Sequence, residues 1–346
     1  MGNLTVAIGE ISIGIMKNKF IATFVFMASI LPGLKAQKLF TLEELNFGGK
    51  NHSVSVPEDW GYSWQGHTLV LNKDGKRQLQ DPSTGKFLEG SPAEKVKNPK
   101  NKGSLEWNPV SGADAILKEN NLYVRYADGQ EVQLSKDGSR ELVYGQSVHR
   151  DEFGIQKGVF WSPDGQKLAY YRMDQSMVAD YPQVNTFERE ATYEPDKYPM
   201  AGRTSHQVTV FVFDLQTQKT TQLAFGDPTD RYFSNIAWSP DAKTLYLYEL
   251  NRDQNFCTLD AYDVASGVKK KTLYSESSDK YVEPLHPITF LPWDSSKFVY
   301  WSWKDGFRHL YLMDVEGKEL GQLTEGTWDV KEIVGFCPST KSLIIL

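Results

Sequence analysis

Cysteine is scarce in this chain of 346 residues, and so are the side-chain clusters that hold metal ions. Only Cys257 and Cys337 are present, and no spacing among them and the six histidines matches a zinc site. The sequence therefore predicts no metal and no cofactor. It favours two buried free thiols, although export to an oxidising compartment leaves a disulfide open.

Basic clusters and nucleotide-binding motifs are missing as well. The formal net charge is −6 at pH 7, and the longest Lys/Arg block is Lys269–Lys271. A basic surface that binds the phosphate backbone of a nucleic acid is therefore not expected. No P-loop, G-x-G-x-x-G or H-E-x-x-H motif occurs. The sequence predicts no nucleic-acid partner.

A catalytic nucleophile cannot be found either. No G-x-S-x-G elbow occurs, and the nearest string, Gly145–His149, lacks the second glycine. The sequence stops at Leu343–Leu346, within what reads as a further strand. We assign no catalytic residue and expect the natural protein to continue.

Long apolar runs are absent except near the N-terminus. A short basic stretch precedes the apolar run 20–34, and Ala36 is a small residue suited to a cleavage site. A membrane anchor is the alternative, but the run is short for a span. We expect a signal-peptide region at 1–36 with Met16 as the true start, and a periplasmic or secreted mature chain, 37–346, without a membrane span.

An internal repeat dominates the rest of the chain. Each copy begins with an aromatic residue, followed by a turn of the Ser-Pro-Asp-Gly type and a strand, as in Trp161–Tyr170 and Trp238–Leu247. Weaker copies begin at these aromatic residues: Trp64, Trp107, Trp293 and Phe336. A second hairpin follows each copy, so one unit supplies four antiparallel strands.

Repeated units of four strands with an aromatic anchor predict a β-propeller. A lone four-stranded sheet cannot bury both faces, whereas radially stacked blades cover one another. The predicted fold class is all-β, a β-propeller of four-stranded blades that is incomplete in this chain. An immunoglobulin-like sandwich is the alternative, but it would not repeat the same unit of two hairpins.

One interval departs from the repeat. Residues 171–207 are polar and rich in Pro and Tyr. Insertions of this size lie on one rim of a propeller, and long irregular loops often carry function. The alternative is a loop without a functional role.

The segment 149–214 resembles the dipeptidyl peptidase IV family, also called the prolyl oligopeptidase family of serine peptidases. An acidic pair before an aromatic residue, a Trp-Ser-Pro turn and a Tyr-Pro-x-Ala-Gly string carry the resemblance: Asp151–Phe153, Phe160–Tyr170 and Tyr198–Gly202. Similarity over nearly the whole mature chain comes from three further strings: Phe40–Leu45, Gly306–Tyr311 and Leu323–Val330.

The resemblance implies an eight-bladed propeller that precedes an α/β-hydrolase domain with a Ser, Asp and His triad. It implies an exopeptidase that releases dipeptides, in some relatives tripeptides, from free N-termini after Pro or Ala. Because the triad would lie beyond Leu346, this chain alone is expected to be inactive. The implied partners are a peptide substrate with a free N-terminus and the C-terminal hydrolase domain, and a homodimer is left open.

The resemblance also assigns two substrate-binding residues, Glu152 and Asp151. They match two consecutive glutamates that bind the substrate's α-ammonium in the family. An N-terminal amine is mostly cationic at neutral pH, and a cation relieves the repulsion between adjacent carboxylates. His149 and Arg150 replace the aromatic and acidic residues usual before the pair. Without the family, such a pair would be read as solvated surface.

Two further positions receive no role. Lys97 falls near a family arginine that holds a substrate carbonyl, but the surrounding sequence aligns poorly. Tyr281 falls near an aromatic of the leaving-group side and is equally well a blade-edge residue.

The predicted function is that of the substrate-gating, N-terminus-binding propeller of a secreted prolyl dipeptidyl peptidase. A periplasmic TolB-like propeller that binds proteins is the alternative, and a polysaccharide-binding propeller has only the aromatic content in its favour.

Overall fold

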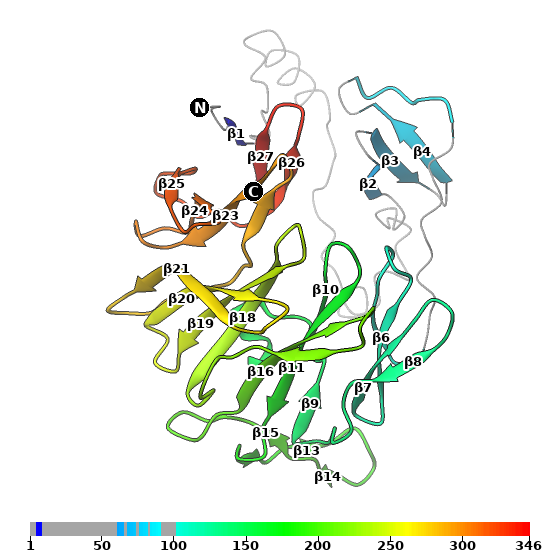
Figure 1. Cartoon of the computed structure of the whole chain (residues 1–346), viewed down its shortest axis with the longest axis vertical. Helices are drawn as coiled ribbons and strands as arrows, with labels where there is room; N and C mark the ends of the chain where they lie inside the picture. Colours follow the sequence, from blue (N-terminus) through cyan, green and yellow to red (C-terminus); the bar gives the residue numbers. More distant parts are fainter. Residues whose placement is uncertain (1–4, 9–60, 66–67, 74–75, 82–83, 91–101) are drawn as a thin grey trace, which may run out of the picture. The chain divides into compact units, whose positions relative to one another are not determined.

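The computed structural model of the chain, shown in Figure 1, describes these residues: 5–8, 61–65, 68–73, 76–81, 84–90 and 102–346. Contacts divide the chain into two units, one of residues 11–97 and one of residues 1–10 with 98–346. The described residues are almost entirely strands and turns, with one short 3-10 element, η1 (His149–Gly154). Among them, no helix has the length and apolar character needed to cross a membrane.

The described residues of the unit 11–97 form an antiparallel sheet. Its strands are β2 (Gly61–Gln65), β3 (Thr68–Lys73) and β4 (Lys76–Gln80), paired in that order. Trp64 lies opposite Leu69 in the register, which confirms the hairpin predicted after this anchor. Val70 and Leu71 of β3 are buried.

Four antiparallel sheets follow one another along the other unit, each with its strands in chain order. The first contains β5 (Ser104–Trp107), β6 (Asp114–Lys118), β7 (Asn121–Arg125) and β8 (Glu131–Gln133). The second contains β10 (Val159–Trp161), β11 (Lys167–Asp174), β16 (Gln207–Asp214) and β17 (Thr220–Gln222), with β9 (Leu142–Tyr144) paired to β11.

The third and fourth sheets repeat this order. The third contains β18 (Arg231–Trp238), β19 (Thr244–Asn251), β20 (Phe256–Asp263) and β21 (Lys269–Ser277). The fourth contains β22 (Thr289–Leu291), β23 (Asp294–Ser302), β24 (His309–Asp314) and β25 (Glu319–Gln322). The second hairpins predicted from the sequence are therefore confirmed in all four sheets.

The last described strands form a smaller sheet. In it, β26 (Ile333–Cys337) pairs antiparallel with β27 (Ser342–Ile345), and β1 (Thr5–Ile8) pairs with β27 in parallel. The expected apolar signal segment and its cleavage site lie outside the described residues.

The insertion between β11 and β16 forms two small paired ladders. In the first, β12 (Asp180–Tyr181) pairs with β15 (Asp196–Lys197). In the second, β13 (Val184–Asn185) pairs with β14 (Thr192–Tyr193). The interval that departs from the sequence repeat is thus a hairpin extension of the second sheet.

Apolar clusters lie between consecutive sheets. Tyr171 of β11, for example, shares one cluster with Phe233 of β18 and Leu247 of β19. Similar clusters join the first sheet to the second, the third to the fourth, and the fourth to the sheet of β26 and β27. Burying each large apolar side chain contributes about 1.5–3 kcal/mol, so the face-to-face stacking of the sheets supplies most of the core.

The anchor tryptophans link each sheet to the one before it. The indole Nε1 of Trp161 donates to the carbonyl of Glu106 at 3.0 Å, and that of Trp238 donates to the carbonyl of Phe160 at 3.1 Å. Each acceptor immediately precedes the anchor of the previous sheet. The repeated aromatic residue therefore sets the contact between neighbouring sheets.

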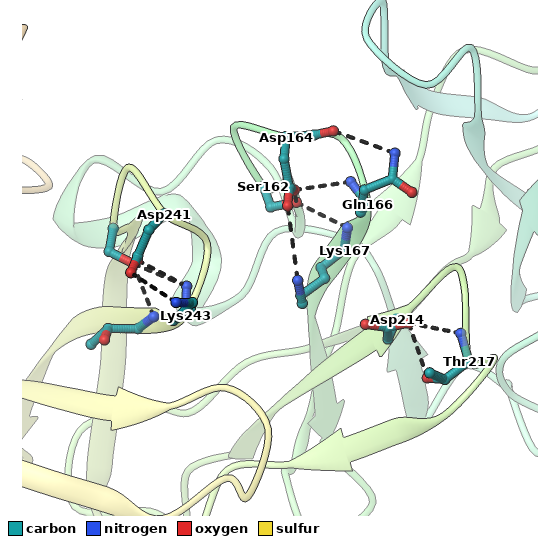
Figure 2. Close-up of polar contacts among 10 residues, drawn as sticks. Ser162, Asp164, Gln166, Lys167, Asp214, Thr217, Asp241 and Lys243 are labelled. Atoms are coloured by element: carbon teal, nitrogen blue, oxygen red, sulfur yellow. Dashed lines mark hydrogen bonds and ion pairs between the residues drawn. The ribbon is translucent and has the colours of Figure 1, made fainter.

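The Ser-Pro-Asp turns after two anchors are built alike, as Figure 2 shows. Ser162 Oγ accepts a hydrogen bond from the Lys167 amide at 2.9 Å and donates to Asp164 at 2.5 Å. In the next sheet, Ser239 donates to Asp241 at 2.6 Å in the same way. The side chains thus satisfy the polar groups of the turn between the first two strands.

Replacing Ser162 by alanine is expected to destabilise the protein by about 1–3 kcal/mol, because a buried turn loses an acceptor and a donor. The shift of the urea midpoint measures this loss. The matched control is Thr217→Ala in the exposed turn that also appears in Figure 2, where the hydroxyl donates to Asp214. The control should change stability by less than about 0.5 kcal/mol, and equal losses in the two variants would contradict the assignment.

The two cysteines are unbridged, as expected. Cys257 is buried, but the expectation that both thiols are buried is wrong for Cys337, which is partly exposed. Cys337 lies at the end of β26, where the chain turns and its Sγ is 3.3 Å from the hydroxyl of Ser339. Hydrogen bonds from Ser339 and Thr340 lower the pKa of this thiol to about 7.

Candidate functional site

The predicted binding residues lie on a backbone segment of unusual conformation. η1 connects β9 to β10, and four of its residues other than glycine have φ between 54° and 63°: His149, Arg150, Asp151 and Phe153. Side chains with a Cβ rarely adopt this left-handed region, at a cost of about 1–3 kcal/mol each. Glu152 is the exception, with an extended backbone at φ −63° and ψ 164°. The surroundings must therefore hold the segment in place.

Buried contacts hold both ends of this segment. His149 and Phe153 are buried, and the ring of Phe153 lies 5.2 Å from that of Tyr232. Asn235 Nδ2 donates to the carbonyl of Phe153 at 3.0 Å. The exposed Glu152 thus stands between two anchored residues.

Gly154 is required by the close approach of another loop. Its φ is 73°, and a Cβ at this position would lie 2.3 Å from the carbonyl oxygen of Leu285. No side chain fits there unless the backbone moves. The end of the segment is thereby fixed against the loop before β22.

Arg150 ties the segment to the insertion. Its Nη1 lies 2.8 Å from a carboxylate oxygen of Asp196 and donates to the carbonyl of Lys197 at 3.1 Å. The guanidinium also lies 4.8 Å from the centre of the Tyr198 ring. Arg150, which stands where the resemblance implies an acidic residue, is therefore paired with Asp196 within the protein.

Glu152 lines a cavity of about 990 Å³, which we call the Glu152 cavity. Its wall includes residues from the end of the insertion and from the third sheet, among them Tyr198, His206, Tyr232 and Arg252. Part of the interval 171–207 thus contributes to the wall of this cavity. Sequence reasoning did not find His206, Tyr232 or Arg252, because no motif surrounds them.

The cationic and anionic side chains of the cavity wall balance in number. Three arginines line it, at positions 150, 203 and 252, together with three carboxylates, at positions 152, 230 and 253. Arg252 Nη1 donates to the hydroxyl of Tyr232 at 2.6 Å. Among the described residues, the carboxylate of Glu152 has no hydrogen-bond or ion-pair partner. It is therefore available to a cationic ligand.

The structure separates the two members of the predicted pair. Asp151 is exposed and does not belong to the cavity wall, whereas Glu152 does. Tyr281 is 56% exposed and is also outside this wall. Lys97 lies outside the described residues. Glu152 is therefore the one carboxylate of the segment that the backbone directs to the cavity.

The family model for the dipeptidyl peptidase IV (DPP IV) N-terminal region matches residues 63–344. The chain belongs to this family. The four-stranded sheets are accordingly the blades of a β-propeller, as the repeat predicted, and the resemblance read from the acidic pair and the Trp-Ser-Pro turn is confirmed.

Two curated fungal relatives carry the name "Probable dipeptidyl-aminopeptidase B". The protein from Phaeosphaeria nodorum is 25% identical over 343 residues, which cover 89% of this chain and 35% of the relative. The protein from Fusarium vanettenii is 29% identical over 258 residues, which cover 65% of this chain and 28% of the relative. The chain thus spans about a third of the length of these relatives.

Two solved bacterial structures are similar over 81% of this chain. One, from Bacteroides ovatus and assigned as a dipeptidyl aminopeptidase IV, is 40% identical with a TM-score of 0.65, and 41% of its chain is covered. The other is dipeptidyl peptidase 4 from Porphyromonas gingivalis, which is 25% identical with a TM-score of 0.61 and is covered over 39% of its chain. The relatives in both comparisons are thus named as dipeptidyl aminopeptidases or dipeptidyl peptidases.

Proposed function

We propose that this chain is the substrate-binding propeller of an exported, serine-type dipeptidyl peptidase, and that Glu152 binds the α-ammonium group of the peptide. Family membership and the names of the relatives support the reaction class. In this proposal, the Ser, Asp and His triad belongs to a C-terminal α/β-hydrolase domain. The apolar N-terminal stretch supports export to the periplasm or the medium.

The unpartnered carboxylate of Glu152 in the cavity wall carries the proposal. Within η1, Arg150 is paired with Asp196, whereas neither the carboxylate of Glu152 nor that of Asp151 has a hydrogen-bond or ion-pair partner among the described residues. A carboxylate without a partner in a cavity binds an ammonium group strongly, because a charge-assisted hydrogen bond replaces its water. Asp151 is proposed as the second carboxylate, which adds negative potential from the exposed side of the segment.

A fixed ammonium site explains how the enzyme would count residues. When the leading amine is held at Glu152, only one peptide bond lies at the right distance from a nucleophile in the partner domain. The propeller wall around the cavity would exclude longer segments of folded protein. The product would then be a dipeptide, and the family resemblance implies Pro or Ala as its second residue.

The test uses the full-length protein and two matched peptides. A peptide with Ala-Pro at a free N-terminus should be cut after the proline, and mass spectrometry should detect the dipeptide. The same peptide with an acetylated N-terminus should be cut about 30- to 1000-fold more slowly, because it lacks the cation. Release of single residues, or equal cleavage of both peptides, would contradict the proposal.

A further inference from the structure

Two histidines lie against each other in the wall of the Glu152 cavity. His149 begins η1, and His206 lies at the end of the insertion, directly before β16. They are 2% and 4% exposed, respectively, and His149 Nδ1 lies 2.7 Å from His206 Nε2. A side chain of the insertion therefore contacts the first residue of the strained segment.

The hydrogen bonds determine which nitrogen of each ring carries the proton. The backbone amide of Phe233 donates to His149 Nε2 at 3.1 Å, so this nitrogen is an unprotonated acceptor. A neutral His149 then carries its proton on Nδ1, which donates to His206 Nε2. His206 consequently accepts at Nε2, and protonation of either ring would remove one of the two hydrogen bonds.

The groups around the pair favour these neutral forms. Burial lowers the pKa of His149 well below its usual value, and the neighbouring His206 and Arg252 lower it further, which outweighs the backbone hydrogen bond with Phe233 that raises it. Burial, Arg252 and Arg150 lower the pKa of His206 to about 4. No carboxylate contributes to either shift, so both rings remain neutral at neutral pH.

Tyr232 and Arg252 also hold the ring of His149 in place. Tyr232 meets it edge-on, with ring centroids 5.0 Å apart, and Arg252 donates to the hydroxyl of Tyr232 at 2.6 Å. The imidazole is thus held by a backbone amide, an aromatic ring and His206. Among these contacts, only His206 comes from the insertion.

We propose that His206 is a positioning residue, which accepts the Nδ1 proton of His149 and so holds the left-handed segment that presents Glu152 to the cavity. The inference rests on the proposed function, because it concerns the same ammonium site. His206 itself need not touch the substrate. It couples the insertion of the second blade to the carboxylate three residues after His149.

The experiment measures KM and kcat of the full-length protein on a Gly-Pro or Ala-Pro anilide with a free amine. His206→Leu removes the acceptor and should raise KM about tenfold with kcat changed less than about threefold. His206→Gln places an amide oxygen near the position of Nε2 and should restore KM to within about threefold of the wild type. A loss in both variants, or in neither, would overturn the inference.

A double-mutant cycle separates this inference from the proposed function. If His206 acts through Glu152, then His206→Leu should change KM less than about twofold in a Glu152→Gln background. A full tenfold change in that background would show an independent effect and overturn the inference. If Glu152→Gln alone has no effect, the proposed function itself fails. If Glu152→Gln raises KM and His206→Leu does not, only the positioning role fails.

His309 provides a matched control for the loss of a buried imidazole. It is fully buried, and its ring nitrogens contact Thr324 Oγ1 at 2.9 Å and the carbonyl of Gly326 at 3.0 Å. It does not line the Glu152 cavity. His309→Leu should lower the thermal stability and leave KM for the free-amine anilide unchanged. A rise of KM like that expected for His206→Leu would assign both effects to general destabilisation and overturn the inference.

Discussion

Replacing Glu152 by alanine in the full-length protein is expected to lower kcat/KM for Gly-Pro or Ala-Pro anilides by about 30- to 1000-fold. This range corresponds to about 2–4 kcal/mol, the typical loss when one partner of a buried charge pair is removed. It requires the bound peptide and the partner domain to cover Glu152, which is exposed in the described part of the chain. The substrate's ammonium would enter the cavity without its partner, among the three arginines of the wall. Steady-state kinetics at neutral pH, where the amine is mostly cationic, measures the effect.

Acetylation of the substrate should mimic this substitution. The wild type should lose a similar factor on an N-acetylated anilide, and the Glu152→Ala variant should lose little more, because the interaction is already gone. Asp151→Asn is the control within the same segment: it should have a smaller effect, since Asp151 lies outside the cavity wall. Unchanged rates for Glu152→Ala and for the acetylated substrate would disprove the ammonium site.

Replacing Gly154 by alanine is expected to destabilise the protein by about 2–5 kcal/mol. Part of the loss comes from an L-residue at φ 73°, and the rest from the contact of 2.3 Å between the new Cβ and the carbonyl of Leu285. Because backbone rather than a flexible side chain blocks this space, the segment itself must shift. Glu152 should therefore move as well, and KM for the free-amine substrate should rise.

The substitution Gly226→Ala separates the cost of the left-handed backbone from the cost of the contact with Leu285. The φ of Gly226 is 79°, but no atom lies within 4 Å of the position of a Cβ. Gly226→Ala should thus show only the backbone term, about 1–2 kcal/mol, with KM unchanged. Urea unfolding of both variants gives the comparison. If the two substitutions cost the same, the contact with Leu285 does not constrain the segment.

Much of the fold could be predicted because its signals are local. The Ser-Pro-Asp turn needs only Ser162 and Asp164 to satisfy its own amides, and the same pattern recurs at Ser239. The anchors Trp161 and Trp238 mark the strands that pack on the preceding sheet. Such a pattern repeats in the sequence, because every blade must pack against its neighbours in the same way.

The acidic pair shows where sequence reasoning stops. Asp151 and Glu152 are neighbours with similar chemistry, yet one is outside the cavity wall and the other is part of it. The difference lies in their backbone: Asp151 has φ 63°, whereas Glu152 is extended. The residue types do not predict a run of residues with left-handed backbone conformation, because contacts with residues distant in sequence stabilise that conformation.

The sequence by itself determined the family, the blade repeat and the segment that carries the candidate carboxylates, because turn chemistry and strand patterns depend on neighbours along the chain. Only the tertiary structure decided which carboxylate reaches the cavity and which residues support it. His149 meets His206, Phe233 and Tyr232, all far from it in sequence. Contacts of this kind form when blades stack, and no local pattern encodes them.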